Sequence, residues 1–200
     1  WKTIHVQDLH YRHPSTGDES GFEVGPLSYS LERGEVAFIS GGNGSGKSTF
    51  AHLLTGLYEP HSGKIYVDSG RIDGRALPSF HQLFSTVFSD GFLFRSIPVA
   101  ELDGAVQEQE VQFWLERLEI AHKVRFEQGR LSLHKLSRGQ EKRVALLIAL
   151  LERRPVLVLD EWAADQDPVF RRHFYLELLP LLKAMGKTIL AITHDDHYFH

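Results

Sequence analysis

The sequence contains no cysteine, and its longest uninterrupted apolar run is residues 144–151. The lack of cysteine excludes disulfide bonds, thiolate metal ligands and a cysteine nucleophile, and it fits a reducing compartment. A membrane-spanning helix needs about 20 consecutive apolar residues, so we expect no part of this chain to cross a bilayer. Excess positive charge is also lacking: Lys and Arg number 22 against 26 Asp and Glu, a net charge of −4. This balance gives no general attraction for nucleic acid.

What the sequence does contain is typical of a folded domain. Its 200 residues are 42% hydrophobic and 24% charged, which suits one globular domain with room for an inserted lobe. The first residue is Trp1 rather than Met, and no charged-then-apolar leader follows. We therefore expect the chain to be a piece of a longer polypeptide.

Hydrophobic periodicity predicts strands alternating with helices. The expected strands are residues 3–9, 27–31, 36–39, 64–68, 85–88, 156–159 and 188–193, and the expected helices are 47–57, 138–153 and 168–185. Residues 13–21 read as a loop, and the spacing over 97–133 is helical, which predicts an inserted helical lobe. Such alternation favours an α/β fold with a mostly parallel sheet covered on both faces.

Residues 41–48 (GGNGSGKS) fit the phosphate-loop pattern G-x-x-x-x-G-K-[ST] at every fixed position. The glycines allow backbone N–H groups to surround a phosphate, Lys47 supplies a positive charge, and Ser48 offers a hydroxyl to Mg²⁺. The alternative is a glycine-rich turn with a chance lysine. The expected strand before it and helix after it favour the phosphate loop.

The apolar strand 156–159 is followed by two adjacent carboxylates, Asp160 and Glu161. Successive side chains of a strand face opposite ways, so the two acids are expected to have different tasks. In a phosphate-loop NTPase, Asp160 would hold Mg²⁺ and Glu161 would polarise the attacking water. The alternative is that they only end the strand and cap the next turn.

Ser137 and Gln140 have the spacing of a capping box at the start of the helix 138–153. A helix N-terminus is also an anion site, where Ser137 and the Gly139 amide could hold a phosphate. At this point the sequence resembles a known family. Residues 136–140 (LSRGQ) are similar to the LSGGQ signature of the ATP-binding cassette (ABC) family.

This resemblance covers the whole chain, and it implies a phosphate-loop NTPase core of the ABC type with antiparallel N-terminal strands. Tyr11 matches the aromatic residue that stacks on adenine, although an ordinary strand tyrosine is the alternative. Asp167 matches the D-loop, although it is equally suited to cap a helix. His194 matches the switch histidine. The implied nucleotide-binding residues are Tyr11, Gly41, Gly42, Asn43, Gly44, Ser45, Gly46, Lys47, Ser48 and Thr49, and the signature residues that act on a partner's ATP are Ser137, Arg138, Gly139 and Gln140.

One position departs from the family. Ser89 occupies the place of the Q-loop glutamine, which reaches toward Mg²⁺ and couples the site to a membrane domain. Serine is too short to do so directly, which leaves three alternatives: a bridging water, substitution by Asp90, or a different coupling. Ser48 and Asp160 are therefore the expected metal ligands, with Ser89 a doubtful third.

Four stretches, 84–90, 136–150, 159–168 and 192–199, look like the bacterial cyclic-peptide and siderophore exporters of the syringomycin and pyoverdine type. The resemblance implies a motor domain at the cytoplasmic face of the inner membrane. It would bind ATP and Mg²⁺ between two copies and follow an N-terminal membrane domain that is not in this sequence. We expect an ATPase core at 1–95 and 136–200 and a helical subdomain at about 96–135.

Three other interpretations were weighed. A soluble ABC ATPase acting on ribosomes or DNA is disfavoured because the sequence has no basic stripe, second cassette or long coiled-coil insertion. A nucleotide-binding module without turnover is disfavoured by intact Lys47, Asp160, Glu161 and His194. A metal site at His194 and His197 explains less than the switch histidine does.

Overall fold

The structure is a computed structural model that describes residues 1–14, 21–89, 91, 96–98 and 108–194. Most of the predicted loop at 13–21, Asp90, residues 99–107 of the predicted lobe and His197 lie outside the described residues.

Within the described residues, the strands form three sheets. The N-terminal sheet is antiparallel, in the order β2-β1-β4-β5, and consists of β1 (Thr3–Arg12), β2 (Glu23–Glu32), β4 (Ser62–Val67) and β5 (Gly70–Arg71). The parallel sheet, in the order β3-β11-β10-β6, consists of β3 (Val36–Ile39), β6 (Phe84–Val87), β10 (Val156–Asp160) and β11 (Thr188–Ile192). A small antiparallel sheet, in the order β7-β9-β8, consists of β7 (Ser96–Pro98), β8 (Val124–Glu127) and β9 (Arg130–Leu133).

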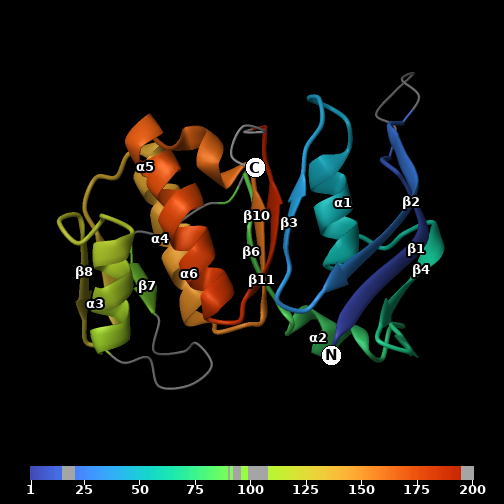
Figure 1. Ribbon diagram of the computed structural model, residues 1–200, viewed down its shortest axis with the longest axis horizontal. Coiled ribbons are helices and arrows are strands. Elements are labelled where there is room, and N and C mark those ends of the chain that lie inside the picture. The colour runs from blue at the N-terminus through green and yellow to red at the C-terminus, as the bar shows by residue number, and fades with distance from the viewer. Residues whose placement is uncertain (15–20, 90, 92–95, 99–107, 195–200) are drawn as a thin grey trace.

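The helices cover both faces of the parallel sheet (Figure 1). Helix α1 (Lys47–Leu54) lies between this sheet and the N-terminal sheet, while α4 (Arg138–Leu151), α5 (Pro168–His173) and α6 (Leu179–Ala184) lie on the other side. Helix α3 (Glu108–Arg117) and the small sheet lie beyond them. The remaining elements are α2 (Leu77–His81), the 3₁₀ turn η1 (Trp162–Asp165) and the π-helical segment η2 (Phe174–Leu178). The architecture confirms the predicted α/β class with antiparallel N-terminal strands.

Two hydrophobic cores follow from this layering. One lies around α1 and includes Ile4, Leu54 and Leu190, all of which are fully buried. The other joins the opposite face of the parallel sheet to α4 and the helices around it, and includes Leu147 and Trp162. Each face of the parallel sheet therefore contacts a separate core, which explains why β10 and β11 are buried at every position.

The prediction of helical structure throughout 97–133 was wrong. Within the described residues, that segment contains one helix, α3, and three strands, β7, β8 and β9. Strands β8 and β9 form a hairpin around Gln128 and Gly129, both of which have positive φ angles. Positive φ at two central residues is typical of a tight hairpin turn, and the segment is a mixed α/β lobe.

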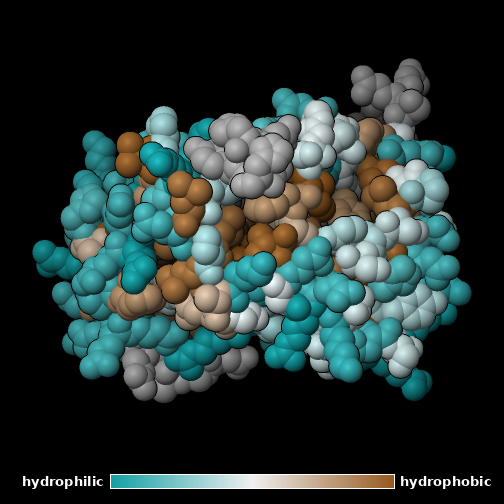
Figure 2. Space-filling model, viewed as in Figure 1, coloured by the Kyte–Doolittle hydropathy of each residue, from teal (hydrophilic) through white to brown (hydrophobic). Residues whose placement is uncertain are grey.

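Among the described residues, no helix combines the length and apolar character needed to span a membrane. Large apolar side chains are exposed along the helical run after β10, at Val169, Leu176 and Met185. Figure 2 shows brown patches over these helices and the middle of the same face, with hydrophilic residues over both flanks.

Candidate functional site

The parallel sheet brings four predicted motifs to one edge. In a parallel sheet the carboxyl ends of all strands meet at the same side. The phosphate loop follows β3, Ser89 follows β6, Asp160 ends β10 and His194 follows β11. The register aligns these ends, because Ile39 pairs with Ile192 and Ile192 with Asp160. Residues far apart in sequence therefore lie together.

The phosphate loop encloses the end of the lysine side chain. Lys47 is buried, and its Nζ donates to the carbonyl oxygens of Gly41 and Gly42, each at 3.0 Å. Gly46 caps α1 in the left-handed conformation, with φ 89°, and a Cβ there would lie 2.7 Å from Val24 Cγ2. No side chain of the described residues caps this helix, so its first N–H groups are available to an anion.

Asp160 has the properties of a cation ligand. Its side chain is buried, and among the described residues its Oδ1 has no hydrogen-bond partner. Burial raises the pKa of the Asp160 carboxyl, against the hydrogen bonds from Ser48 and Ser89. Ser89 Oγ lies 3.4 Å from Asp160 Oδ2, so serine reaches the carboxylate although it is shorter than glutamine. Carboxylate and hydroxyl oxygens of this kind are the ligands that Mg²⁺ prefers.

Glu161 and His194 face each other, with Glu161 Oε1 3.2 Å from His194 Nε2. Glu161 adopts the left-handed conformation, with φ 48°, which is strained for a residue with a side chain. Its peptide is held on both sides: the N–H donates to the Ile192 carbonyl, and the carbonyl accepts Lys142 Nζ at 2.8 Å. Asp160 and Glu161 thus have separate partners.

The signature segment forms the predicted capping box. Ser137 Oγ accepts the Gln140 N–H, and Gln140 Oε1 accepts the Ser137 N–H at 3.0 Å. Arg138 is exposed, and its Nε lies 3.2 Å from Asp165 Oδ2. Capping and anion binding are compatible, because the cap orders the helix start.

Ion pairs connect α4 to η1, the 3₁₀ turn that follows β10. Lys142 Nζ lies 2.7 Å from Asp165 Oδ2, and this lysine, with help from Arg138, lowers the pKa of the Asp165 carboxyl. A Cβ on Gly139 would lie 2.6 Å from the Asp165 carbonyl oxygen, so the two backbones pack in close contact. Gln166 Nε2 donates to the Gly139 carbonyl at 3.1 Å.

Arg143 is the centre of a second group of contacts. Its guanidinium donates to Gln166 Oε1 at 2.9 Å and to Asp167 Oδ2 at 2.8 Å, and its Cζ lies 3.4 Å from the centre of the Phe170 ring. Asp167 also caps α5 by accepting the Phe170 N–H at 3.0 Å. That backbone hydrogen bond, with Arg143, lowers the pKa of Asp167. The helix-cap alternative for Asp167 is therefore present in the structure.

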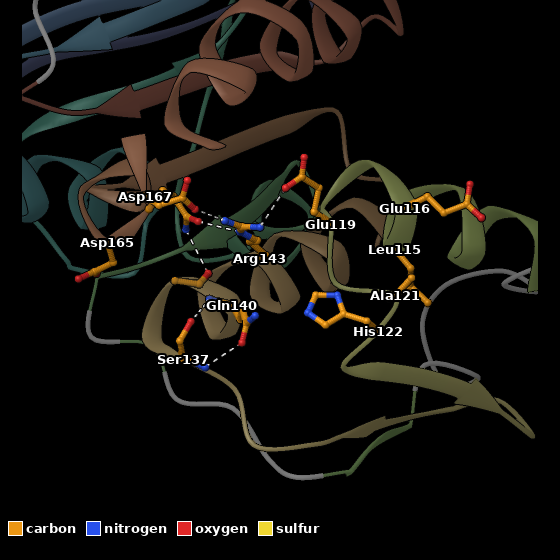
Figure 3. A pocket seen from close by; sticks show the side chains of 12 residues that line it. Leu115, Glu116, Glu119, Ala121, His122, Ser137, Gln140, Arg143, Asp165 and Asp167 are labelled. Atoms are coloured by element: carbon orange, nitrogen blue, oxygen red, sulfur yellow. Dashed lines mark hydrogen bonds and ion pairs between the residues drawn. The ribbon is translucent and has the colours of Figure 1, made fainter. Parts of the chain in front are cut away.

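A pocket of about 580 Å³ opens beside these contacts (Figure 3). Its lining includes Ser137, Gln140, Arg143, Asp167 and Glu119, and none of its lining residues comes from the phosphate loop. The signature segment therefore lines a pocket that the phosphate loop does not share.

Tyr11 belongs to an aromatic group near α1. Its ring stacks on Tyr58 at 5.0 Å between centroids, and the His13 ring meets it edge-on at 5.0 Å. His13 Nε2 in turn lies 3.0 Å from Thr49 Oγ1, in the first turn of α1. The structure thus brings Tyr11 toward the phosphate loop.

The sequence analysis missed His13, Lys142 and Arg143, and it included Asp165 in the stretch 159–168 without predicting its ion pairs. The charges in residues 138–143 (RGQEKR) were a usable signal, since a helix start that carries several cations needs acidic partners nearby. His13 carries no comparable signal, because its role depends on a contact between distant segments.

Comparison with known proteins identifies the family of this chain. Residues 24–164 match the family model described as ABC transporter. The chain is 44% identical over its full length to the ATP-binding protein SyrD of Pseudomonas syringae pv. syringae, and it spans about a third of that protein, 35% of its length.

Two solved structures share the fold. The dimeric structure of MJ0796, a bacterial ABC transporter cassette, is 26% identical with a TM-score of 0.76, covering 98% of this chain and 89% of that one. A bacterial Atm1-family ABC exporter with ATP bound is 23% identical with a TM-score of 0.80, covering 98% of this chain and 35% of that one; this likeness concerns the fold alone. The chain belongs to the ABC transporter family, of which it is an ATP-binding and ATP-hydrolysing domain.

Proposed function

We propose that this domain hydrolyses Mg-ATP between two copies of itself and drives export through an attached membrane domain. The observation that carries the proposal is the grouping of Lys47, Asp160, Glu161 and His194 at one edge of the parallel sheet. This edge combines an anion site, a cation site and a carboxylate with a facing histidine, which together suit phosphoryl transfer to water.

Each group has a distinct task. The ATP phosphates would replace the Gly41 and Gly42 carbonyls as partners of Lys47, and the α1 N–H groups would bind the same anion. Ser48 and Asp160 would hold Mg²⁺, near Ser89; the ion supplies positive charge that stabilises the phosphates during transfer. Glu161 would accept a proton from the attacking water, and His194 would orient that water and the γ-phosphate.

A second copy would complete the site. The phosphate loop does not line the signature pocket, so we infer that head-to-tail pairing would place Ser137 and Gly139 of one copy against the ATP of the other. The likeness to the dimeric MJ0796 cassette supports this arrangement. Tyr11 would stack on adenine, and Asp167 would lie beside the shared site.

Export of a cyclic peptide or siderophore rests on the subfamily resemblance of residues 159–168 (LDEWAADQDP) and on the full-length similarity to SyrD. The proposal places the domain at the cytoplasmic face of a bacterial inner membrane, after an N-terminal membrane domain.

The test is ATP hydrolysis by the purified protein over a range of protein concentrations. Because two copies form each site, the rate should rise faster than linearly with concentration in the range where pairing is incomplete. Glu161→Gln should reduce kcat by at least about 100-fold while ATP binding persists, and it should trap an ATP-dependent dimer visible by light scattering.

Glu59→Gln is the matched control, because Glu59 is exposed and lies outside the sheet edge. It should behave as the parent protein. Near-parent hydrolysis by Glu161→Gln would exclude Glu161 as the base. A rate strictly proportional to concentration, with a monomer in Mg-ATP, would overturn the shared site.

A further inference from the structure

The helical run after β10 contains a π-helical segment, η2, between α5 and α6. Pro180 lies just beyond it, at the start of α6. In a regular α-helix the proline ring would meet the carbonyl of Leu176 four residues earlier, and proline has no N–H to donate to it. The wider turn accommodates this conflict. Single π turns occur frequently at functional sites.

The π segment presents Tyr175 to the parallel sheet. The Tyr175 hydroxyl lies 2.8 Å from Thr193 Oγ1, and both residues are buried. The Tyr175 ring also contacts Phe38 of β3, with 6.4 Å between ring centres. Burying two hydroxyl groups is favourable only if they are bonded, so this pair fixes the helix and the end of β11 relative to one another.

Thr193 connects this contact to the reacting groups. Its N–H donates to the Ile39 carbonyl at 3.1 Å, at the end of the strand that leads into the phosphate loop. The next residue is His194, whose Nε2 faces Glu161 Oε1 at 3.2 Å. Thr193 is therefore held by its backbone to β3 and by its side chain to the π segment, directly before the histidine.

We propose that Tyr175 is a positioning residue for ATP hydrolysis, which acts through Thr193 to hold His194 in line with Glu161 and the phosphate loop. The inference rests on the proposed function of His194, and it adds a buried residue that is not among the proposed nucleotide or metal ligands. The π turn is the element that directs Tyr175 to this position.

The test compares variants that keep or remove the two hydroxyl groups. Tyr175→Phe should lower kcat about tenfold with KM for ATP unchanged within twofold, because small displacements of an aligned group affect turnover more than binding. Thr193→Val should have the same effect, and the double variant no more than either. Thr193→Ser keeps the hydroxyl and should retain parent activity.

Two further variants separate positioning from general stability. Tyr66→Phe removes a tyrosine hydroxyl from β4 in the N-terminal sheet and should leave kcat unchanged. In a His194→Ala background, Tyr175→Phe should cause no further loss, because the group that it positions is gone. The ¹⁵N resonance of His194 Nε2, assigned by its loss in His194→Ala, should shift in Tyr175→Phe.

The outcomes distinguish the two proposals. Parent-like kcat in Tyr175→Phe, or an equal loss in the parent and His194→Ala backgrounds, would overturn the positioning role while leaving the proposed function intact. Equal activity of His194→Ala and the parent would instead overturn the role of the histidine. If Tyr175→Phe does not fold, the comparison of Thr193→Ser with Thr193→Val decides, and equal kcat values would refute the proposal.

Discussion

Lys142 and Asp165 form a short ion pair, 2.7 Å between Nζ and Oδ2, that joins the signature helix to the turn after β10. The lysine is buried and the carboxylate is mostly covered, whereas Arg138 on the same carboxylate is exposed. Solvent weakens the arginine contact more than the lysine contact, so Lys142 makes the stronger attachment.

Asp165→Asn should therefore destabilise the protein by about 1 kcal/mol at pH 7, because Lys142 loses its charged partner. The folded-state pKa of Asp165 is lowered, so its stabilising effect is present above the unfolded pKa of about 3.9 and is lost as pH falls through the folded-state value. Urea unfolding of parent and variant should differ at pH 7, and the difference should begin to shrink as pH falls below about pH 4 and vanish below the folded-state pKa of Asp165. A constant difference across this range would contradict the assignment.

Gly139→Ala should impair hydrolysis more than it impairs nucleotide binding by the same chain. The added Cβ would lie 2.6 Å from the Asp165 carbonyl, which forces the signature helix away from the D-loop. We expect the free energy of unfolding to fall by about 1 to 3 kcal/mol. We also expect ATP-dependent pairing of two copies to be lost. Gly74→Ala is the control, because a Cβ there has no atom within 4 Å. Isothermal titration and light scattering measure binding and pairing separately.

Asp160→Asn should stabilise the protein without metal and abolish its Mg-dependent activity. Burial disfavours the ionised carboxyl, and its Oδ1 has no partner among the described residues, so removing the charge should raise the unfolding free energy by about 1 kcal/mol. In the presence of Mg-ATP the parent should become the more stable of the two proteins, because only the parent gains stability from metal-dependent binding. Thermal unfolding with and without Mg-ATP checks both parts, and a variant that is less stable in metal-free buffer would contradict the first.

Arg143→Ala should be among the most destabilising substitutions on α4, at about 3 kcal/mol. It removes the donor to Gln166 and Asp167 and the cation on the Phe170 ring. Arg143→Lys keeps the charge but not the planar fork, so it should recover only part of the loss. Urea unfolding midpoints rank the stability of the parent and the two variants. Parent-like stability of Arg143→Lys would contradict the prediction and show that the charge at this position is sufficient.

The position of the phosphate loop at the sheet edge could be predicted because the strand and the helix that flank it are both recognisable in the sequence. Strand, glycine loop and helix follow one another around Lys47, and the predicted strand 36–39 matches β3. Because the strands of this sheet are parallel, the carboxylates at the end of β10 lie at the same edge of the sheet as that loop. The contacts of Asp160 with Ser48 and Ser89 agree with this logic, while the catalytic roles of these residues stay predictions.

The errors have local causes. The amphipathic pattern of α3 was extended across residues 124–133, although Gln128 and Gly129 there form a tight hairpin turn. The helix 168–185 was predicted without the π segment that Pro180 accompanies. The charged contacts of Asp165 could not be found by periodicity, because they depend on how closely two backbones approach at Gly139.

Strand β10 is buried at every position, and this has a consequence for which of the two carboxylates at its end faces His194. A strand with one apolar face resists sliding, because a shift of one residue would expose that face to water. Both faces of β10 are apolar from Val156 to Leu159, so these four side chains alone do not oppose such a shift. A slip by one position would move one of the two carboxylates into the place of the other: Asp160 into that of Glu161, or Glu161 into that of Asp160, according to the direction of the slip. The contacts at the strand ends, Thr188 N–H to the Pro155 carbonyl and Glu161 N–H to the Ile192 carbonyl, therefore help to fix which carboxylate lies beside Ser89 and which faces His194.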